Sequence, residues 1–400
     1  MKQLIKLTAL VIGLVLAFSC ISCNNGSNEE EPQHGGQTGG TQSSLATLNT
    51  LKDIDGFPGV YTIEYDGDYK LDEAINSNLI SSEDLLDYIE DNLMSWKTNV
   101  EAGAPLRINV QGAACSSIVA ENTNPDVGGY IIGRNFDWEP GSSLILHAMP
   151  DNGYESVSTC FLEFVSDESD WAPNDDVFNN AVAIACVYVP MDGMNEKGLY
   201  IANLNSNGDA RLTNTDDTSK KNVQTTIAIR YILDRCSTVA EAVAWLETIN
   251  MCPVYGDEVL YHNSGVPVYS KDYHFAIADN SGHSVVVEWI GGEMKVTETK
   301  VVTNHYLDED NRPDTANGDK DLESSLSRYQ TLEEAGKAQQ WKMNTTNIKQ
   351  VLSSVQQMHS VWSAIFEPSA KRVTYYFRDT NAADDDDTPI DYTKSVVVQF

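Results

Sequence analysis

The chain has 400 residues and carries 59 Asp and Glu against 26 Lys and Arg, a formal net charge of −33 at pH 7. Proteins bind nucleic acids and anionic lipid surfaces largely through Lys and Arg, so this charge argues against both as partners. Hydrophobic residues make up 41% of the chain, which argues against a largely disordered protein. The length fits either two to three domains or one large two-layer core.

The N-terminus is predicted to be an export signal over residues 1–23. Lys2 and Lys6 precede an apolar run at 7–18 (LTALVIGLVLAF), which is followed by small residues. This run is shorter than the roughly 20 residues that span a bilayer, and the pattern is typical of a secretory signal. Cys23, directly followed by polar residues, resembles the lipidated cysteine of a bacterial lipoprotein, with Cys20 as the alternative. We therefore expect an exported protein that is attached to a bacterial membrane, at the cell envelope or surface, through a lipid anchor alone.

Two further segments precede the main part of the chain. Residues 24–44 are rich in Gly, Ser, Asn, Gln, Thr and Glu, which predicts a flexible tether with a reach of roughly 25 Å. Residues 45–114 are foldable, with a strand expected at 59–65 and a helix at 81–96, capped by Ser81 with Asp84 in its first turn. This segment fits either a small N-terminal subunit or a pro-segment that lies on another core.

Residues 115–400 show repeated short apolar strands without regular strand–helix alternation, which predicts an α+β architecture. Helices are expected over 223–234, 238–249 and 347–358. Strands are expected over 115–121, 129–136, 181–189, 198–204, 273–278, 284–289, 300–303, 360–366 and 372–377.

Motifs for metals and nucleotides are not found in the sequence. It has no HExxH, no second C-x-x-C after residues 20–23, no phosphate-binding glycine motif and no G-x-S-x-G. The acidic run 384–387 lacks the alternating ligands of a calcium loop and is interpreted as a solvated turn. We therefore expect neither a metal nor a cofactor.

Five cysteines follow the signal, and an odd number leaves at least one thiol outside internal pairing in an oxidising compartment. Cys186 lies in the apolar run 181–189 and is predicted to be buried. Cys115 instead opens a strand after the small residues 111–114, where a chain could be cut and a new terminus exposed. The five are Cys115, Cys160, Cys186, Cys236 and Cys252.

Three motifs occur in order from this cysteine: ACSSIVAE at 114–121, GRNFDW at 133–138 and DGMNEKGL at 192–199. Together they resemble the choloylglycine hydrolase family of N-terminal-nucleophile amidases, which includes bile salt hydrolases, penicillin V acylases and, more distantly, the acid ceramidase and N-acylethanolamine amidase group. The first motif and its long upstream segment resemble the ceramidase branch, and the third resembles the bile salt branch. The resemblance implies a four-layer αββα sandwich and hydrolysis of linear amides. Family members are often oligomeric, so the resemblance is also compatible with a homo-oligomer.

The resemblance carries over to single residues. Cys115 matches the nucleophile, Arg134 and Asp137 match the charged pair beside it, and Asn205 matches an oxyanion-hole asparagine. The remaining active-site Asn and Arg match Asn304 and Arg328. Without the family order, Arg134 and Asp137 are more simply interpreted as an ordinary ion pair, and the asparagines as turn residues.

The chemistry of an N-terminal cysteine supports amide hydrolysis independently of the resemblance. Its α-amine has a pKa near 8 and can serve as the general base beside the thiol. Arg134 would favour the thiolate, Asp137 would orient the amine, and Asn205 would stabilise the oxyanion by about 3 kcal/mol. The amide would then be cleaved through a thioester that water hydrolyses.

The position of Cys115 departs from many bile salt hydrolases, whose nucleophile follows the initiator Met. Here the Ala114–Cys115 bond must be cut, and we predict self-cleavage, after which 45–114 either leaves or remains as a small subunit. The leading hypothesis is a hydrolase of small-molecule acyl amides, either bile acid conjugates or N-acyl amines and amino acids. The alternative is a noncatalytic, ligand-binding surface lipoprotein with an intact Ala114–Cys115 bond.

Overall fold

The computed structural model describes residues 39–94, 96, 106–110, 114–168, 171–206, 217–252, 260–261, 267–268, 272–290, 292–308, 320–379 and 389–400. The predicted signal with Cys20 and Cys23, most of the tether and the acidic run 384–387 lie outside these residues. Within them, no helix is both long and apolar enough to cross a membrane.

The larger of two main sheets has nine strands in the order β1-β2-β5-β6-β7-β8-β13-β14-β15. All neighbours are antiparallel except β2 and β5, which run parallel. Its strands are β1 (Lys52–Asp53), β2 (Val60–Asp66), β5 (Ser143–Met149), β6 (Ser156–Phe161), β7 (Asp192–Asn195), β8 (Tyr200–Ser206), β13 (Asp272–Ala278), β14 (Ser284–Ile290) and β15 (Glu293–Glu298).

The second sheet has the order β16-β3-β4-β18-β19-β20, with β17 added parallel to β3. Its strands are β16 (Val301–Val302), β3 (Ala114–Asn122), β4 (Tyr130–Asp137), β17 (Lys342–Met343), β18 (Ser360–Glu367), β19 (Arg372–Phe377) and β20 (Val396–Gln399). Two small pairs lie apart from both sheets: β9 (Lys221–Gln224) with β10 (Ile249–Cys252), and β11 (Leu260–Tyr261) with β12 (Pro267–Val268).

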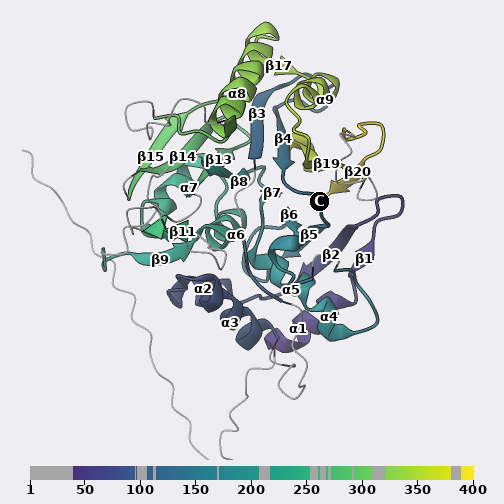
Figure 1. Ribbon diagram of the computed structural model, residues 1–400, viewed down its shortest axis with the longest axis vertical. Helices are drawn as coiled ribbons and strands as arrows, with labels where there is room; N and C mark the ends of the chain where they lie inside the picture. The colour runs from purple at the N-terminus through teal and green to yellow at the C-terminus, as the bar shows by residue number, and fades with distance from the viewer. Residues whose placement is uncertain are drawn as a thin grey trace, which may run out of the picture. The chain divides into compact units, whose positions relative to one another are not determined.

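Helices cover the outer faces of the two sheets, so the structure has four layers (Figure 1). Helices α8 (Lys320–Ala338) and α9 (Thr345–Ser354) contact β3 and β4, whereas α6 (Thr225–Arg235) and α7 (Val239–Leu246) contact β7, β8 and β14. The inner faces meet through hydroxyl contacts such as that of Ser117 on β3 with Tyr200 on β8, at 3.1 Å. This αββα order confirms the predicted fold class. The remaining helices are α1 (Gly39–Leu48), α2 (Leu71–Asn76), α3 (Ser82–Leu93), α4 (Val177–Asn180), α5 (Val182–Ala185), η2 (Leu162–Phe164), η3 (Cys186–Tyr188) and η4 (Pro368–Ala370).

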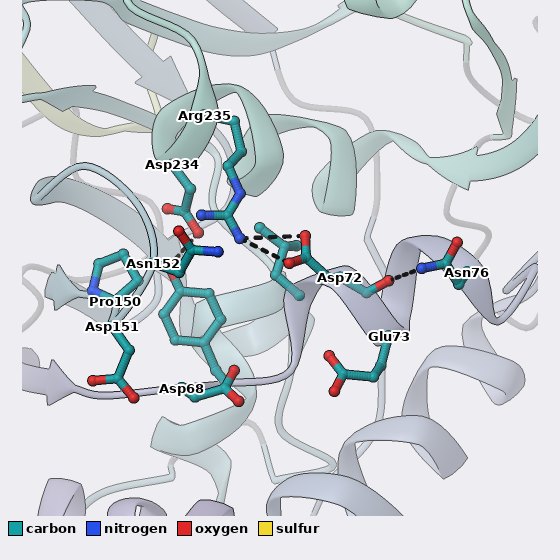
Figure 2. A pocket seen from close by; sticks show the side chains of 11 residues that line it. Asp68, Asp72, Glu73, Asn76, Pro150, Asp151, Asn152, Asp234 and Arg235 are labelled. Atoms are coloured by element: carbon teal, nitrogen blue, oxygen red, sulfur yellow. Dashed lines mark hydrogen bonds and ion pairs between the residues drawn. The ribbon is translucent and has the colours of Figure 1, made fainter. Parts of the chain in front are cut away.

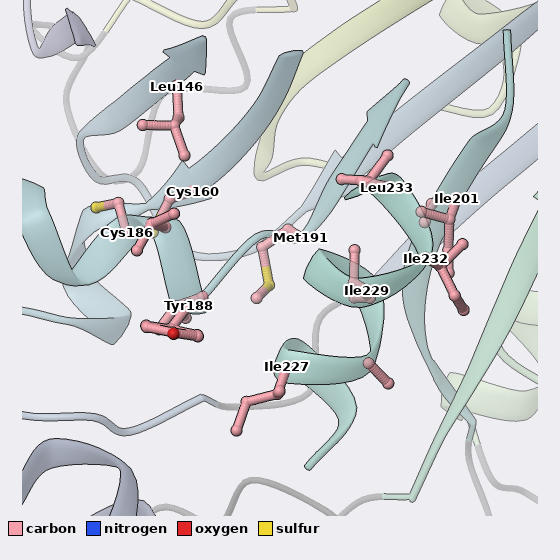
Figure 3. Packing of buried hydrophobic residues seen from close by; sticks show 14 of the residues in the cluster. Leu146, Cys160, Cys186, Tyr188, Met191, Ile201, Ile227, Ile229, Ile232 and Leu233 are labelled. Atoms are coloured by element: carbon pink, nitrogen blue, oxygen red, sulfur yellow. The ribbon is translucent and has the colours of Figure 1, made fainter. Parts of the chain in front are cut away.

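The expected strands agree with observed ones with a single exception, the run 181–189. This run forms α5 and η3 rather than a strand, and all its residues are buried. A short apolar run that is buried on every side has no amphipathic period, so periodicity alone does not separate a strand from a helix. Figure 3 shows Cys186 and Tyr188 of this segment in the same packed cluster as Cys160 of β6 and residues of α6. The prediction that Cys186 is buried is confirmed, and the strand prediction is wrong.

The N-terminal segment is part of the main fold. Its strand β2 pairs with β5 along seven residues, and α3 begins with the expected capping box between Ser81 and Asp84. Structure also starts earlier than the predicted end of the tether at residue 44, because α1 begins at Gly39. The buried Ser44 hydroxyl lies 3.2 Å from the Tyr65 hydroxyl, so packing on β2 orders residues whose composition suggested a flexible linker.

Candidate active site

Cys115 is the second residue of β3, and the alternation of the strand decides where its side chain points. Ile118 and Ala120 lie in the cluster beneath α8 and α9, whereas Cys115 and Val119 belong to the other core cluster. Successive side chains of a strand point to opposite faces. The thiol of Cys115 is therefore placed between the two sheets, fully buried, with its sulfur 3.9 Å from the carbonyl oxygen of Asn203 on β8.

The backbone of Cys115 is held by two of the predicted residues. Its N–H donates to the Oδ1 of Asn304 at 2.8 Å, and its carbonyl oxygen accepts from Nη1 of Arg328. Arg328 also donates from Nη2 to Asn304 Oδ1 at 2.7 Å. Asn304 and Arg328 thus form one polar cradle around the backbone of Cys115.

Asn304 is itself fixed from two directions. Its Nδ2 donates to the carbonyl oxygen of Asn205 at 2.7 Å, and its backbone N–H donates to the Ser325 hydroxyl at 2.8 Å. Asn205 is the sixth residue of β8, in register with Tyr273 of β13. Asn304 therefore joins β8 of the nine-stranded sheet to α8, and it contacts Asn205 through the backbone carbonyl oxygen of that residue.

Arg134 lies on β4, and its side chain is fully buried. Its Nε lies 3.3 Å from Asp192 Oδ2, and its Nη2 donates to the Asn203 carbonyl oxygen at 2.9 Å. Among the described residues, the carboxylate that forms an ion pair with Arg134 is Asp192 and not Asp137. Arg134 thus links the two sheets beside the thiol.

Asp137 is buried at the end of β4, directly opposite Ala114 in the strand register. It accepts a hydrogen bond from the Ser360 hydroxyl on β18. Burial raises the pKa of this carboxyl, and the nearby Arg328 and Arg134 offset the effect only in part. A carboxylate with a raised pKa is a better proton acceptor than an ordinary one.

The pKa of the Cys115 thiol is raised. The sequence predicted the opposite direction, because Arg134 was expected to favour the thiolate. Burial raises the pKa of Cys115, whereas Arg134 and Arg328 lower it and Asp137 raises it further, with a raised pKa as the result. Arg134 acts in the expected direction, but removal of the thiol from water outweighs it. In the uncut chain the sulfur is therefore held as a thiol at neutral pH.

A cavity of about 390 Å³ opens at this point of the fold. Ala114 lines it, whereas Cys115 lies behind Ala114 and is 0% exposed. Four of the predicted residues also reach its wall. They are Asp137, Asn205, Asn304 and Arg328.

Several polar residues of this site were not predicted. Asp192 opens the DGMNEKGL motif, and its partnership with a distant buried Arg leaves no local pattern in sequence. Asn203 precedes Asn205 by two positions, so the two side chains point to the same face of the strand. This spacing could have predicted Asn203 from the sequence. Ser325 and Ser360 are common residues in polar contexts, and their roles come from contacts across the fold.

Asp192→Asn is expected to lower the free energy of unfolding by about 3 kcal/mol, because it leaves the buried Arg134 without a compensating charge. Urea unfolding followed by tryptophan fluorescence measures this, with both chains carrying Cys115→Ala so that they are compared uncut. Asp55→Asn, at an exposed carboxylate, is the matched control. A loss equal to that of the control would contradict the prediction.

The other four cysteines lie away from this cavity. Cys160, Cys186, Cys236 and Cys252 are buried, and none of the five described cysteines forms a disulfide. Over the same described ranges, no group of three or more His, Cys, Asp or Glu side chains is arranged to hold a metal ion.

Comparison with known proteins places these residues in a family. Conjugated bile acid hydrolase from Clostridium perfringens, in two variant structures, is 16% and 15% identical, with 71% of this chain and 92% of that chain covered and TM-scores of 0.47 and 0.46. Penicillin V acylase from Agrobacterium tumefaciens is 17% identical, with coverage of 66% and 83% and a TM-score of 0.40. No curated protein sequence matches. Residues 115–306 match the family described as linear amide C–N hydrolases, choloylglycine hydrolase family, and the match begins at Cys115 itself. Residues 115–306 therefore match the choloylglycine hydrolase family of linear amide C–N hydrolases, as the motifs predicted.

Proposed function

We propose that the protein is made as an inactive precursor, cuts itself between Ala114 and Cys115, and then uses Cys115 to hydrolyse linear amides with an apolar acyl group. The observation that carries the proposal is the order of the two residues at the cavity. Ala114 lines the wall and Cys115 is buried behind it. Cleavage of the bond between them would free the α-amine and give substrates access to the thiol.

The self-cleavage step uses groups that surround this bond. The Cys115 sulfur bonds to the carbonyl carbon of Ala114, the amide bond breaks, and Asp137 passes the thiol proton to the departing nitrogen. Water then hydrolyses the thioester, which leaves a carboxylate on Ala114 and restores the thiol. Asp137 suits this transfer because it is buried opposite Ala114 and its pKa is raised by burial.

Turnover repeats the same chemistry on an external amide. The new α-amine takes the place of the amide nitrogen, within hydrogen-bonding distance of Asn304 Oδ1, and accepts the thiol proton. Sulfur attacks the substrate carbonyl carbon, the amine leaves with a proton, and water hydrolyses the acyl thioester. The amide group of Asn205 would stabilise the oxyanion, a contribution of about 10²–10³ in kcat when one such donor is removed.

A panel of amides tests this function: glycocholate, taurocholate, N-oleoylethanolamine, N-acyl amino acids and penicillin V. Purified cut protein is expected to hydrolyse at least one of them, and Asn205→Ala is expected to lower kcat about a hundredfold with a smaller change in KM, because its contribution is made in the transition state. Release of the free amine is the readout. Cut protein that turns over no amide of the panel would overturn the proposed activity.

The predicted location adds a lipid anchor to this picture. We place the anchor on Cys23, in the export signal, so that residues 24–38 connect the membrane to α1. The catalytic region would then be held at the membrane through the pairing of β2 with β5 after the bond at Cys115 is cut.

A further inference from the structure

Two exposed carboxylates are among the described residues that line the catalytic cavity. Glu139 and Asp321 line the cavity, and both residues are exposed. Glu139 follows the end of β4, and Asp321 lies in the first turn of α8. The two carboxylates thus reach the same cavity from two elements that are far apart in the sequence.

The guanidinium of Arg328, on the described part of this wall, already has partners, and the charge of Asp321 acts on it as well. Arg328 is 5% exposed, and its two terminal nitrogens contact the carbonyl oxygen of Cys115 and the Oδ1 of Asn304. His359 is the remaining basic side chain that the described residues contribute to the wall. An anionic group entering the cavity would therefore approach two carboxylates and meet a guanidinium that is turned toward the nucleophile.

Apolar surface is present in the same cavity. Trp138 and Met358 line it, and Met358 is 57% exposed. An apolar acyl group can lie on these side chains, which leaves the amine portion of the substrate to meet the charged mouth. The cavity of about 390 Å³ is of the size of an ordinary small-molecule site.

We infer that Glu139 and Asp321 select amides whose amine portion carries a positive charge, and that they disfavour conjugates of amino acids whose free carboxylate would enter the same mouth. This inference rests on the proposed function and narrows its substrate class to N-acyl derivatives of diamines and related cationic amines. In water, one unit charge about 4 Å from another changes binding by about fivefold, so two carboxylates can separate cationic from anionic substrates by more than about tenfold.

A second cavity offers the matched control. It has a volume of about 330 Å³ and is lined by residues within 68–76, 150–152 and 234–235, none of which reaches the catalytic cavity. Figure 2 shows Glu73 and Asp151 on its wall, and the ion pair of Asp72 with Arg235 at 3.2 Å. Neutralising Glu73 and Asp151 changes the net charge of the protein as much as neutralising Glu139 and Asp321, but away from the nucleophile.

The experiment compares three dodecanoyl amides of nearly equal shape, made from 1,4-diaminobutane, 4-aminobutanol and 4-aminobutyrate. In the cut wild-type protein at low salt, kcat/KM is expected to be at least about tenfold higher for the cationic amide than for the anionic one, with the neutral amide between them. The ratio is expected to shrink in about 0.5 M salt because exposed charges are screened.

The variants assign this preference to residues. Glu139→Gln with Asp321→Asn is expected to bring the cationic-to-anionic ratio to within about threefold of one. Glu73→Gln with Asp151→Asn is expected to keep the wild-type ratio. His359→Gln tests whether the imidazole contributes. If this variant, rather than the carboxylate variant, brings the cationic-to-anionic ratio close to one, the assignment to the carboxylates is overturned.

Failure of the selectivity and failure of the activity give different results. If the protein hydrolyses the neutral amide in a Cys115-dependent manner, and kcat/KM for the anionic amide equals or exceeds that for the cationic amide, the inference is overturned. The proposed amidase activity is not contradicted by that result. Turnover of an amide of the earlier panel without hydrolysis of any of these three overturns the inference alone, whereas no hydrolysis of either set by cut protein overturns both.

Discussion

Cys115→Ala is expected to leave the chain uncut, whereas the wild-type chain from Asn24 onward is expected to separate into two polypeptides, the larger of which begins at Cys115. The reason is that the sulfur is the attacking atom, and an alanine side chain has no nucleophile to replace it. Intact mass and N-terminal sequencing measure both outcomes. Amide hydrolysis is expected to be lost in the same variant because neither the thiol nor the α-amine is formed.

The control for this prediction is another buried cysteine. Cys252→Ala removes a thiol that is 1% exposed and does not line the catalytic cavity, and it is expected to be cut as the wild type is. An uncut wild-type chain would contradict self-cleavage and would favour a binding protein or the need for a separate protease. Cutting of Cys115→Ala at the same bond would instead show that the nucleophile comes from elsewhere.

The N-terminal fragment is expected to stay bound after the cut. Strand β2 lies inside the nine-stranded sheet, between β1 and β5, and its Ile63 and Tyr65 side chains are fully buried. The Tyr69 hydroxyl donates to the buried Asp234, and Gln224 donates to the Ser81 carbonyl oxygen at 2.6 Å. Full burial of one large apolar side chain contributes about 1.5–3 kcal/mol, so loss of the fragment would cost as much as a domain's net stability of about 5–15 kcal/mol.

Size-exclusion chromatography tests this association. The two fragments are expected to elute together in buffer and to separate in guanidinium chloride, and a chain that begins at Cys115 is expected to be insoluble because β5 would expose an unpaired edge. In membranes, detergent extraction is expected to recover both fragments together, because the smaller one carries Cys23. A larger fragment that remains folded and active alone in the aqueous phase would contradict the prediction.

Local patterns in the sequence predicted several helices and strands of this structure and the family motifs. The capping box of Ser81 and Asp84 begins α3, the strands at 115–121 and 360–366 lie where they were expected, and the family match begins at Cys115. These features depend on residues that are close in the chain or on motifs in a set order. Period and capping are local properties, so they can be read without the fold.

The tertiary structure decided the features that depend on what surrounds an element. The run 181–189 became helical inside a core that buries every residue of it, and α8 was not predicted because its buried stripe, Ser325, Arg328 and Leu332, is short and partly polar. The partnership of Arg134 with Asp192 joins two sheets across 58 positions. The sequence thus predicted the nucleophile and the family that residues 115–306 match. Burial decided the pKa of the Cys115 thiol, because that pKa depends on the water and charges around the sulfur in the folded chain.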